Sequence, residues 1–338
     1  MNFNLDRFSI IIAMSINLIA IFFFYENASF GSKFVYALDD PYIHLQIAKN
    51  LAEFGTFGIN AGNFESASSS PIWNLLLYGI IELFGNSDKI PFFINLTLVF
   101  PVIYMINRIL ISIDFKGFRP VILTGISLSI SIPSLVIIGM EHLLHILLVL
   151  VLLNQFLKFL DNKKISMIIV PILLVIGLVR YESLFLTTLF PMVLFYKKDR
   201  LKSFIIFALP LLSILIFGVY SIQNGGYFLP NSLLIKSGFR YDSIFNLLYN
   251  FYTAISKIID SYSISNLIML CLLVSYLSLK KTFPTELIFL VSLIIIHALF
   301  ASFGWLFRYE AYLIAIGIPI LILSFTKLKI KLSKSLIL

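Results

Sequence analysis

The sequence predicts an all-α integral membrane protein, in which residues 1–338 form a single bundle of about ten transmembrane helices. Of its 338 residues, 59% are apolar and 12% are charged, and the mean hydropathy is +0.99. Soluble domains are about 45–50% apolar and about 25% charged, so much of the apolar surface here must face lipid. The apolar residues also gather in runs near the length of about 20 residues that a membrane-crossing helix needs. A soluble globule, a disordered chain and a collagen are excluded.

Ten apolar runs are predicted to be transmembrane helices. The first of them, 8–25, is longer than the apolar core of about 7–15 residues in a signal peptide, so we interpret it as a retained membrane anchor. Each run is expected to cross the bilayer once. The remaining nine runs are 90–112, 119–138, 143–160, 165–179, 183–196, 203–222, 262–279, 285–304 and 309–326.

The further apolar segment 71–84 decides the topology. Its 14 residues would form a helix of about 21 Å, which is shorter than the bilayer hydrocarbon core of about 30 Å. If this segment does not cross, 17 of the 25 Lys and Arg residues fall on one side, which is then the cytoplasmic side. We therefore expect 71–84 to lie along the outer leaflet and both termini to be cytoplasmic. Two large segments, 26–89 and 223–261, then face outward.

Composition limits the partners and cofactors. The net charge of +8 reflects the positive residues that membrane proteins keep on their cytoplasmic side, so no nucleic-acid partner is predicted. Cys271 is the single cysteine, which excludes an intrachain disulfide. The sequence has no Walker or Rossmann glycine pattern, and its four histidines lack the further ligands of a zinc site. Neither a nucleotide nor zinc is therefore predicted.

Two adjacent carboxylates precede a predicted amphipathic helix in the first outer segment. We expect this helix to have Asp40 as its N-cap and Pro41 in its first turn, and to end at Phe54, before Gly55. Asp39 has no such structural use, and a carboxylate near the positive end of a helix suits a general base. The alternative is that Asp40 only caps the helix and Asp39 is a solvated surface charge. The residues predicted to face the membrane surface are Ile43, Ile47, Leu51 and Phe54.

Further charged residues are predicted to gather at the outer ends of the helices. Each one alone is also explained as an interfacial charge or as part of a local Arg–Glu pair. Together they place cations opposite the two aspartates, where arginine and lysine would bind the phosphate of a lipid. The residues concerned are Glu141, His142, Arg180, Glu182, Lys236, Arg308 and Glu310.

A series of motifs runs through most of the chain. The first block holds Asp-Asp-Pro-Tyr-Ile-His at 39–44, Phe-Gly-Ile-Asn-Ala-Gly-Asn-Phe-Glu at 57–65 and Ser-Pro-Ile-Trp at 70–73. Later motifs are Gly-Met-Glu at 139–141, Arg-Tyr-Glu at 180–182, Leu-Pro-Asn-Ser at 229–232 with Lys236, and Arg-Tyr at 308–309. The series resembles GT-C fold glycosyltransferases, in particular the mycobacterial arabinofuranosyltransferases that add terminal arabinose and their bacterial relatives. The chain departs from the family pattern at Asn63, which is usually glutamate, and at Ser66, which is usually glycine.

The resemblance implies transfer of a sugar from a polyprenyl-phosphate carrier to a glycan, lipid or protein acceptor at the outer face of a bacterial cytoplasmic membrane. We assign Asp39 as the general base and Asp40 as the residue that orients the acceptor. One carboxylate in line with one leaving group predicts a single displacement with inversion. The donor phosphate is assigned to Arg180, Lys236 and Arg308. The sugar of the donor or acceptor is assigned to Tyr42, His44, Glu65, Glu141, Glu182 and Asn231.

Alternatives stand beside this assignment. No metal is required, because arginine and lysine supply the positive charge, but Asp39 and Asp40 could together hold Mg²⁺ or Mn²⁺. A transporter or flippase of a lipid-linked or anionic substrate would also place charges among many spans, although transporters commonly bind their substrate near the bilayer midplane. A scaffold without chemistry would explain the spans but not the gathering of charge.

Overall fold

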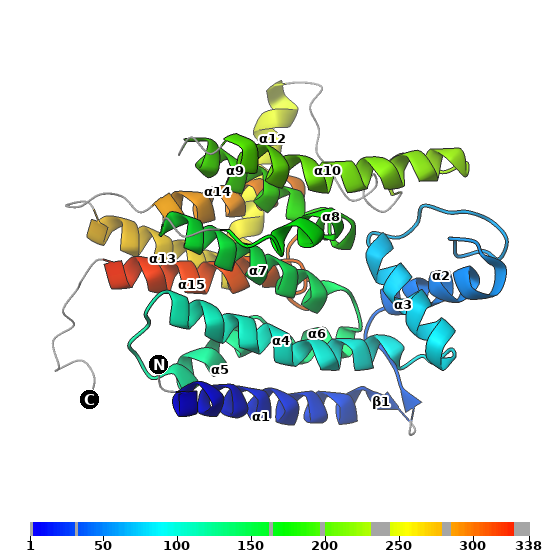
Figure 1. Cartoon of the computed structure of the whole chain (residues 1–338), viewed down its shortest axis with the longest axis horizontal. Helices are drawn as coiled ribbons and strands as arrows, with labels where there is room; N and C mark the ends of the chain where they lie inside the picture. The colour runs from blue at the N-terminus through cyan, green and yellow to red at the C-terminus, as the bar shows by residue number, and fades with distance from the viewer. Residues whose placement is uncertain are drawn as a thin grey trace.

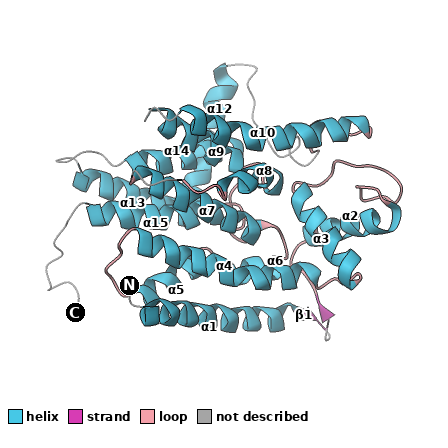
Figure 2. Ribbon diagram, in the orientation of Figure 1, coloured by secondary structure: helices cyan, strands magenta, loops and turns pink. Residues whose placement is uncertain are grey.

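The structure, a computed structural model, describes residues 3–30, 33–161, 165–196, 200–230, 244–278 and 285–327. Apart from loops and turns, the described part is helical except for one antiparallel hairpin, in which β1 (Ser29–Phe30) pairs with β2 (Lys33–Phe34) (Figure 2). Long helices run side by side as a bundle, and α2 and α3 lie together beyond one end of it (Figure 1). The bundle includes α1 (Phe3–Ala28), α4 (Ile90–Ser112), α7 (His142–Leu160), α10 (Arg200–Gln223) and α15 (Ala311–Lys327).

Each of the ten predicted apolar runs contains a helix, but the predicted count of about ten spans is not confirmed. Among the described residues, five helical segments are long and apolar enough to cross a membrane if Arg119–Ile138 counts as one of them, or six if the bent pair α12 and α13 also forms one span. The two helices of that pair meet at 95°. The other apolar helices have 10–17 residues. The remaining bounds are α8 (Ile169–Val179), α9 (Ser183–Tyr196), α12 (Ile244–Asp260), α13 (Tyr262–Ser278) and α14 (Thr285–Phe300).

The predicted run 119–138 is broken into α5 (Arg119–Ser129) and α6 (Ile132–Ile138). Between them Ser131 has a left-handed backbone with φ of 61°. Pro133 favours the break, because it has no N–H to donate and in a continuous helix its ring would collide with the carbonyl of Ser129, four positions earlier. Helix α6 ends at Gly139, where φ is 71° and a Cβ atom would lie 2.3 Å from the ring of Tyr36. This glycine allows the sharp turn into α7. Glu141 lies in this turn, directly before the first residue of α7.

The segment 26–89, which the sequence predicts to face outward, contains two packed helices, α2 (Asp40–Phe54) and α3 (Pro71–Phe84). As predicted, α2 ends at Phe54, and Gly55 adopts the left-handed conformation that stops it. Of the residues predicted to face the membrane surface, Ile47 is fully buried, which contradicts the prediction, whereas Phe54 is exposed. Another face of α2 packs on α3, where Leu45 and Ala48 pack with Trp73. Helical periodicity alone does not reveal which neighbour covers a face. Here α3 covers the face that carries Leu45 and Ala48.

The two ends of the bundle carry different charged groups. Where α1 begins and α15 finishes, Arg119 pairs with Asp6, and Lys327 pairs with Glu286 at 2.6 Å. At the opposite end, the connections that follow α6, α8 and α14 converge with the first turn of α2 (Figure 1). The candidate site lies at this convergence.

Candidate active site

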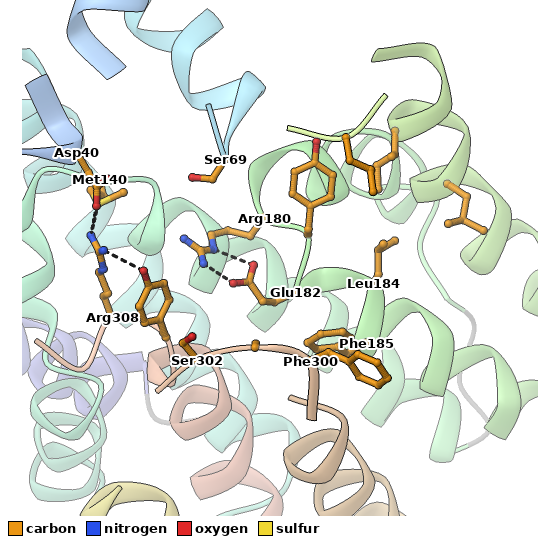
Figure 3. Close-up of a pocket in the computed structure, with 16 residues that line it drawn as sticks. Asp40, Ser69, Met140, Arg180, Glu182, Leu184, Phe185, Phe300, Ser302 and Arg308 are labelled. Carbon is orange, nitrogen blue, oxygen red and sulfur yellow. Dashed lines mark hydrogen bonds and ion pairs between the residues drawn. The ribbon is translucent and has the colours of Figure 1, made fainter. Parts of the chain in front are cut away.

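A cavity of about 480 Å³ opens where these connections meet the start of α2. Its volume lies within the range of about 300–1,000 Å³ that is usual for small-molecule sites. The polar end is formed by Asp40, Arg180, Glu182 and Arg308, four of the residues that the sequence assigns to the site. Figure 3 shows apolar side chains on the side away from Arg308. The apolar lining consists of Leu184, Phe185, Leu211, Ile214, Leu229 and Phe300.

Arg180 is held at the polar end by two carboxylates. Its Nη1 donates to Glu141 Oε1 at 2.7 Å, its Nε donates to Glu182 Oε2 at 3.0 Å, and its Nη2 donates to the second oxygen of Glu182. Burial alone would lower the pKa of Arg180, but Glu182 and Glu141 raise it above its ordinary value. Burial alone would raise the pKa of Glu182, but Arg180 lowers it to about 2. The Arg180–Glu182 pair is therefore ionised at neutral pH, and the contact of Arg180 with Glu141 ties two connections of the bundle together.

Arg308 is the second cation of the cavity. Its Nη1 donates to Asp40 Oδ2 at 2.8 Å and lies 2.8 Å from Sδ of Met140, and its Nη2 donates to Tyr309 Oη at 3.0 Å (Figure 3). Its Nε is buried and has no hydrogen-bond partner among the described residues. The side chain of Arg308 is 4% exposed and that of Asp40 is 28% exposed. Asp40 is therefore the more accessible member of this ion pair.

The ring of Tyr309 contacts both guanidinium groups. The Cζ atom of Arg180 lies 5.4 Å from the ring centroid, and that of Arg308 lies 4.8 Å from it. Both distances are within the range of about 6 Å for cation–π attraction. Tyr309 therefore holds the two cations of the cavity at a fixed spacing.

The two adjacent aspartates have different surroundings. Because α2 begins at Asp40, the N-cap position belongs to Asp39, which corrects the predicted cap. Asp39 has a helical backbone instead of the extended one typical of N-caps, and its side chain makes no capping hydrogen bond. Asp39 is exposed, whereas Asp40 lines the cavity. Asp40 is thus the aspartate that a ligand in the cavity would meet.

His44 and Glu141 lie in a buried polar cluster behind the cavity. Nδ1 of His44 is 2.9 Å from Oδ1 of Asn74, which also accepts a hydrogen bond of 2.6 Å from Ser68 Oγ. The amide of Asn74 donates in turn to the backbone carbonyl of His44 at 3.3 Å. On the other side of the ring, Nε2 of His44 lies 3.8 Å from Oε2 of Glu141. This cluster fixes the first turn of α2, which carries Asp40.

Two other predicted residues are used in local structure. Tyr42 Oη accepts a hydrogen bond of 3.1 Å from the backbone N–H of Tyr36. Glu65 accepts hydrogen bonds from the backbone N–H of Ile59 at 3.1 Å and from the side chain of Asn60 at 2.5 Å, so it closes its own loop. Tyr42 and Glu65 do not line the cavity. The predicted residues that lie outside the described part are Asn231 and Lys236.

The structure also brings residues to the site that the sequence reasoning did not assign to it. Met140 and Tyr309 lie next to assigned residues in their motifs. This adjacency was the feature of the sequence from which their place at the site could have been predicted. Ser69 lines the cavity from the segment before α3. Its neighbours Ser68 and Ser70 are buried, so this serine run is packed against the site.

All four histidines are buried, and two of them lie beyond the cavity. Nε2 of His145 is 2.9 Å from Ser183 Oγ, and Nδ1 of His297 is 2.9 Å from Tyr312 Oη. Within the described part of the chain, no group of three or more His, Cys, Asp or Glu residues is arranged to hold a metal ion. These histidines instead contribute hydrogen bonds to the packing between helices.

The site is assembled from segments that are far apart in the chain. Asp40 comes from α2, Arg180 follows α8 and Arg308 precedes α15, and 268 positions separate the partners of the Asp40–Arg308 ion pair. Charged side chains gathered in a cleft with a strongly shifted pKa among them are typical of functional sites. Compared with protein-family models, with curated proteins and with solved structures, the chain matches none.

Proposed function

We propose that this chain is a glycosyltransferase that takes a sugar from a polyprenyl-phosphate carrier and passes it to a hydroxyl group of a glycan, lipid or protein. The observation that carries the proposal is the amphiphilic cavity, with Asp40, Arg180 and Arg308 at one end and an apolar lining beyond them. A carboxylate beside guanidinium groups suits a reaction that needs a base and releases an anion. The apolar lining suits the hydrocarbon chain of the carrier.

In the proposed reaction, Asp40 takes the proton of the acceptor hydroxyl as its oxygen attacks the anomeric carbon of the sugar. The bond between that carbon and the phosphate oxygen breaks, and its electron pair leaves with the polyprenyl phosphate. Arg308 stabilises the negative charge that gathers on the departing phosphate. A single displacement of this kind inverts the anomeric configuration.

The contacts divide the other predicted residues between two roles. Arg180 is held by Glu141 and Glu182, so we assign it chiefly to positioning, with its charge adding to that of Arg308. Glu182 lines the cavity and is placed to contact the sugar. His44 and Glu141 lie behind the lining and position α2. Lys236 stays a candidate for the donor phosphate.

The distribution of charge supports a placement in the membrane. With both termini in the cytoplasm, the cavity faces outward, because the connections after α6, α8 and α14 lie at the end of the bundle opposite its more basic end. We therefore propose a multi-pass protein of a bacterial cytoplasmic membrane whose site is extracytoplasmic. Lipid-linked sugars would reach this site from the outer leaflet.

Purified protein incubated with polyprenyl-phosphate sugars and candidate acceptors tests the proposal. We expect Asp40→Asn to lower the rate of transfer by about 10²–10⁴-fold, the usual contribution of a general base. Comparison with Asp39→Asn shows which carboxylate contributes more to the rate of transfer. We expect Asp40→Asn to lower this rate more than Asp39→Asn does. EDTA distinguishes the guanidinium mechanism, which survives the chelator, from one in which both aspartates hold a divalent cation. Full transfer by Asp40→Asn would contradict the assignment of the base.

Transport of a lipid-linked or anionic substrate is the second candidate function. The observation that favours it is the pair of buried histidines in α7 and α14, because ionisable groups within a membrane bundle commonly mark a pathway for ions or substrate. Proteoliposomes loaded with a labelled lipid-linked sugar separate the two functions. Movement of the intact lipid between leaflets without transfer of its sugar would favour transport.

A further inference from the structure

We infer that the phosphate group of the lipid substrate displaces Asp40 from Arg308, so that the carboxylate occupies the phosphate position until the substrate arrives. The inference rests on the proposed function and deepens it. It makes Asp40 available as a base only when a donor is bound. It also assigns the exchangeable anion site of the cavity to Arg308 and not to Arg180.

The unequal contacts of the two arginines support this choice. Arg180 donates to two carboxylates, and the one that is farther away in the sequence, Glu141, is fully buried. Among the described residues, Arg308 donates to one carboxylate and otherwise contacts neutral atoms of Tyr309 and Met140. A buried guanidinium that loses its anion without replacement is strongly destabilised. An incoming phosphate can therefore replace Asp40 far more easily than it can replace the two partners of Arg180.

The geometry of Arg308 suits the exchange. Both members of the Asp40–Arg308 pair line the cavity, and Asp40 is the more exposed of the two. Carboxylate and phosphate oxygens both accept hydrogen bonds from the planar fork of a guanidinium. Nε of Arg308 is buried without a hydrogen-bond partner among the described residues, so a phosphate oxygen could accept a hydrogen bond from a donor that Asp40 does not use. A phosphate would therefore gain a contact that the carboxylate does not make.

The exchange also keeps the charges of the reaction in balance. Before transfer, the bound donor is a phosphodiester with one negative charge, and Asp40 carries another. Afterwards Asp40 holds the proton of the acceptor and is neutral, while the released phosphate monoester carries a charge approaching −2. The total is nearly unchanged. Arg308 thus faces growing charge on the phosphate as the charge on Asp40 disappears.

Equilibrium binding of farnesyl phosphate to the purified full-length protein tests the inference without requiring turnover. We expect Asp40→Asn to bind this probe about tenfold more tightly than the wild type, because the competing carboxylate is gone. Arg308→Gln should bind it at least about tenfold more weakly. Glu53→Gln removes the same charge from an exposed position at the far end of α2 and is the matched control, with unchanged affinity. Farnesol, which lacks the phosphate, should bind equally to wild type and Asp40→Asn.

Thermal unfolding verifies that each variant is folded. If Asp40→Asn does not fold, Asp40→Ser replaces it as the neutral variant. Asp40→Glu keeps the competing charge and should bind like the wild type. The inference is overturned if the neutral variants bind farnesyl phosphate no more tightly than the wild type, or if Glu53→Gln or farnesol shows the same gain. If the gain appears but no sugar is ever transferred, anion exchange at Arg308 stands and the proposed glycosyl transfer fails. If transfer requires Asp40 but the gain is absent, only this inference fails.

Discussion

At the residue scale, three carboxylates pair with the two guanidinium groups of the cavity, and two of the three, Asp40 and Glu182, line it. Asp40, Glu141 and Glu182 carry the negative charge, and Arg180 and Arg308 carry the positive charge. An anionic ligand therefore meets a cluster in which every guanidinium already has a carboxylate partner. Binding an anion there requires one ion pair to open, and the most exposed carboxylate of the three, Asp40, is the one whose release costs least.

The pair between Arg180 and Glu182 makes a prediction about pH. Arg180 lowers the pKa of Glu182 from its ordinary value of 4.5 to about 2, so the pair stabilises the fold fully above about pH 4.5 and loses this effect as the pH falls toward 2. We expect Glu182→Gln to lower the free energy of unfolding by about 3 kcal/mol, near the lower end for breaking a buried pair, because Glu141 still faces Arg180.

Thermal unfolding of the purified protein in detergent, at several pH values, measures this effect. The difference in unfolding temperature between wild type and Glu182→Gln should be constant from pH 5.5 to 8, since both pKa values of Glu182 lie below that window. Lys116→Cys, at an exposed position outside the site, serves as a control for mutation as such. A difference that shrinks between pH 8 and 5.5 would show that Glu182 titrates there and that the pair is weaker than its geometry indicates.

At the element scale, the contact between α2 and α3 determines where Asp40 stands. Trp73 is fully buried beneath Leu45 and Ala48, and its indole N–H has no hydrogen-bond partner among the described residues. We expect Trp73→Ala to lower the free energy of unfolding by about 3–5 kcal/mol, the usual cost of truncating a buried Trp. Trp73→Phe should cost about 1–2 kcal/mol, because it keeps most of the ring volume and removes only an unpaired donor.

Unfolding temperatures of the two variants, measured beside the rate of sugar transfer, check this prediction. Trp73→Ala should also reduce transfer, because a loosened α2 no longer holds Asp40 against Arg308. Leu83→Ala, at an exposed position near the end of α3, is the matched control and should change neither quantity in detergent. Equal stability of Trp73→Ala and wild type would mean that the packing of α2 on α3 does not support the site.

The elements also show which features a sequence can predict. The end of α2 at Gly55 follows from local chemistry, because glycine takes the left-handed conformation at little cost. The break near Ser131 could not have been foreseen from Pro133 alone, because α4, α10 and α15 continue through Pro101, Pro210 and Pro319. The buried face of α2 could not, because it depends on the position of α3 in three dimensions.

At the scale of the whole molecule, the gathering of charge was predictable but its pairing was not. Alternation of the apolar runs places Arg180 and Arg308 at one end of the bundle, and the structure brings both to one cavity. Asp40 and not Asp39 is the partner of Arg308 because of where α2 begins and how it is tilted. If α2 began one residue earlier or later, the other aspartate would face Arg308. The number of spans depends likewise on helix tilt and bending, which apolar run lengths do not determine.

The topology itself makes the last prediction, and two positions on either side of α4 test it. If α3 does not cross the membrane, one span separates residue 61, in the segment between α2 and α3, from residue 116, between α4 and α5. If α3 does cross, two spans separate them, and both residues face the same side. The excess of Lys and Arg near residue 116 predicts the first arrangement, with residue 61 outside and residue 116 in the cytoplasm.

A membrane-impermeant thiol reagent distinguishes the two arrangements. The native Cys271 is 1% exposed and would be replaced by serine, after which Ala61→Cys and Lys116→Cys each place one thiol at an exposed position. We expect Ala61→Cys to react in intact cells and Lys116→Cys to react only after the membrane is permeabilised. The background without either cysteine should stay unlabelled in both conditions. Labelling of both variants in intact cells would mean that α3 is a span, and the cavity would then no longer be assigned to the outer face on the basis of charge.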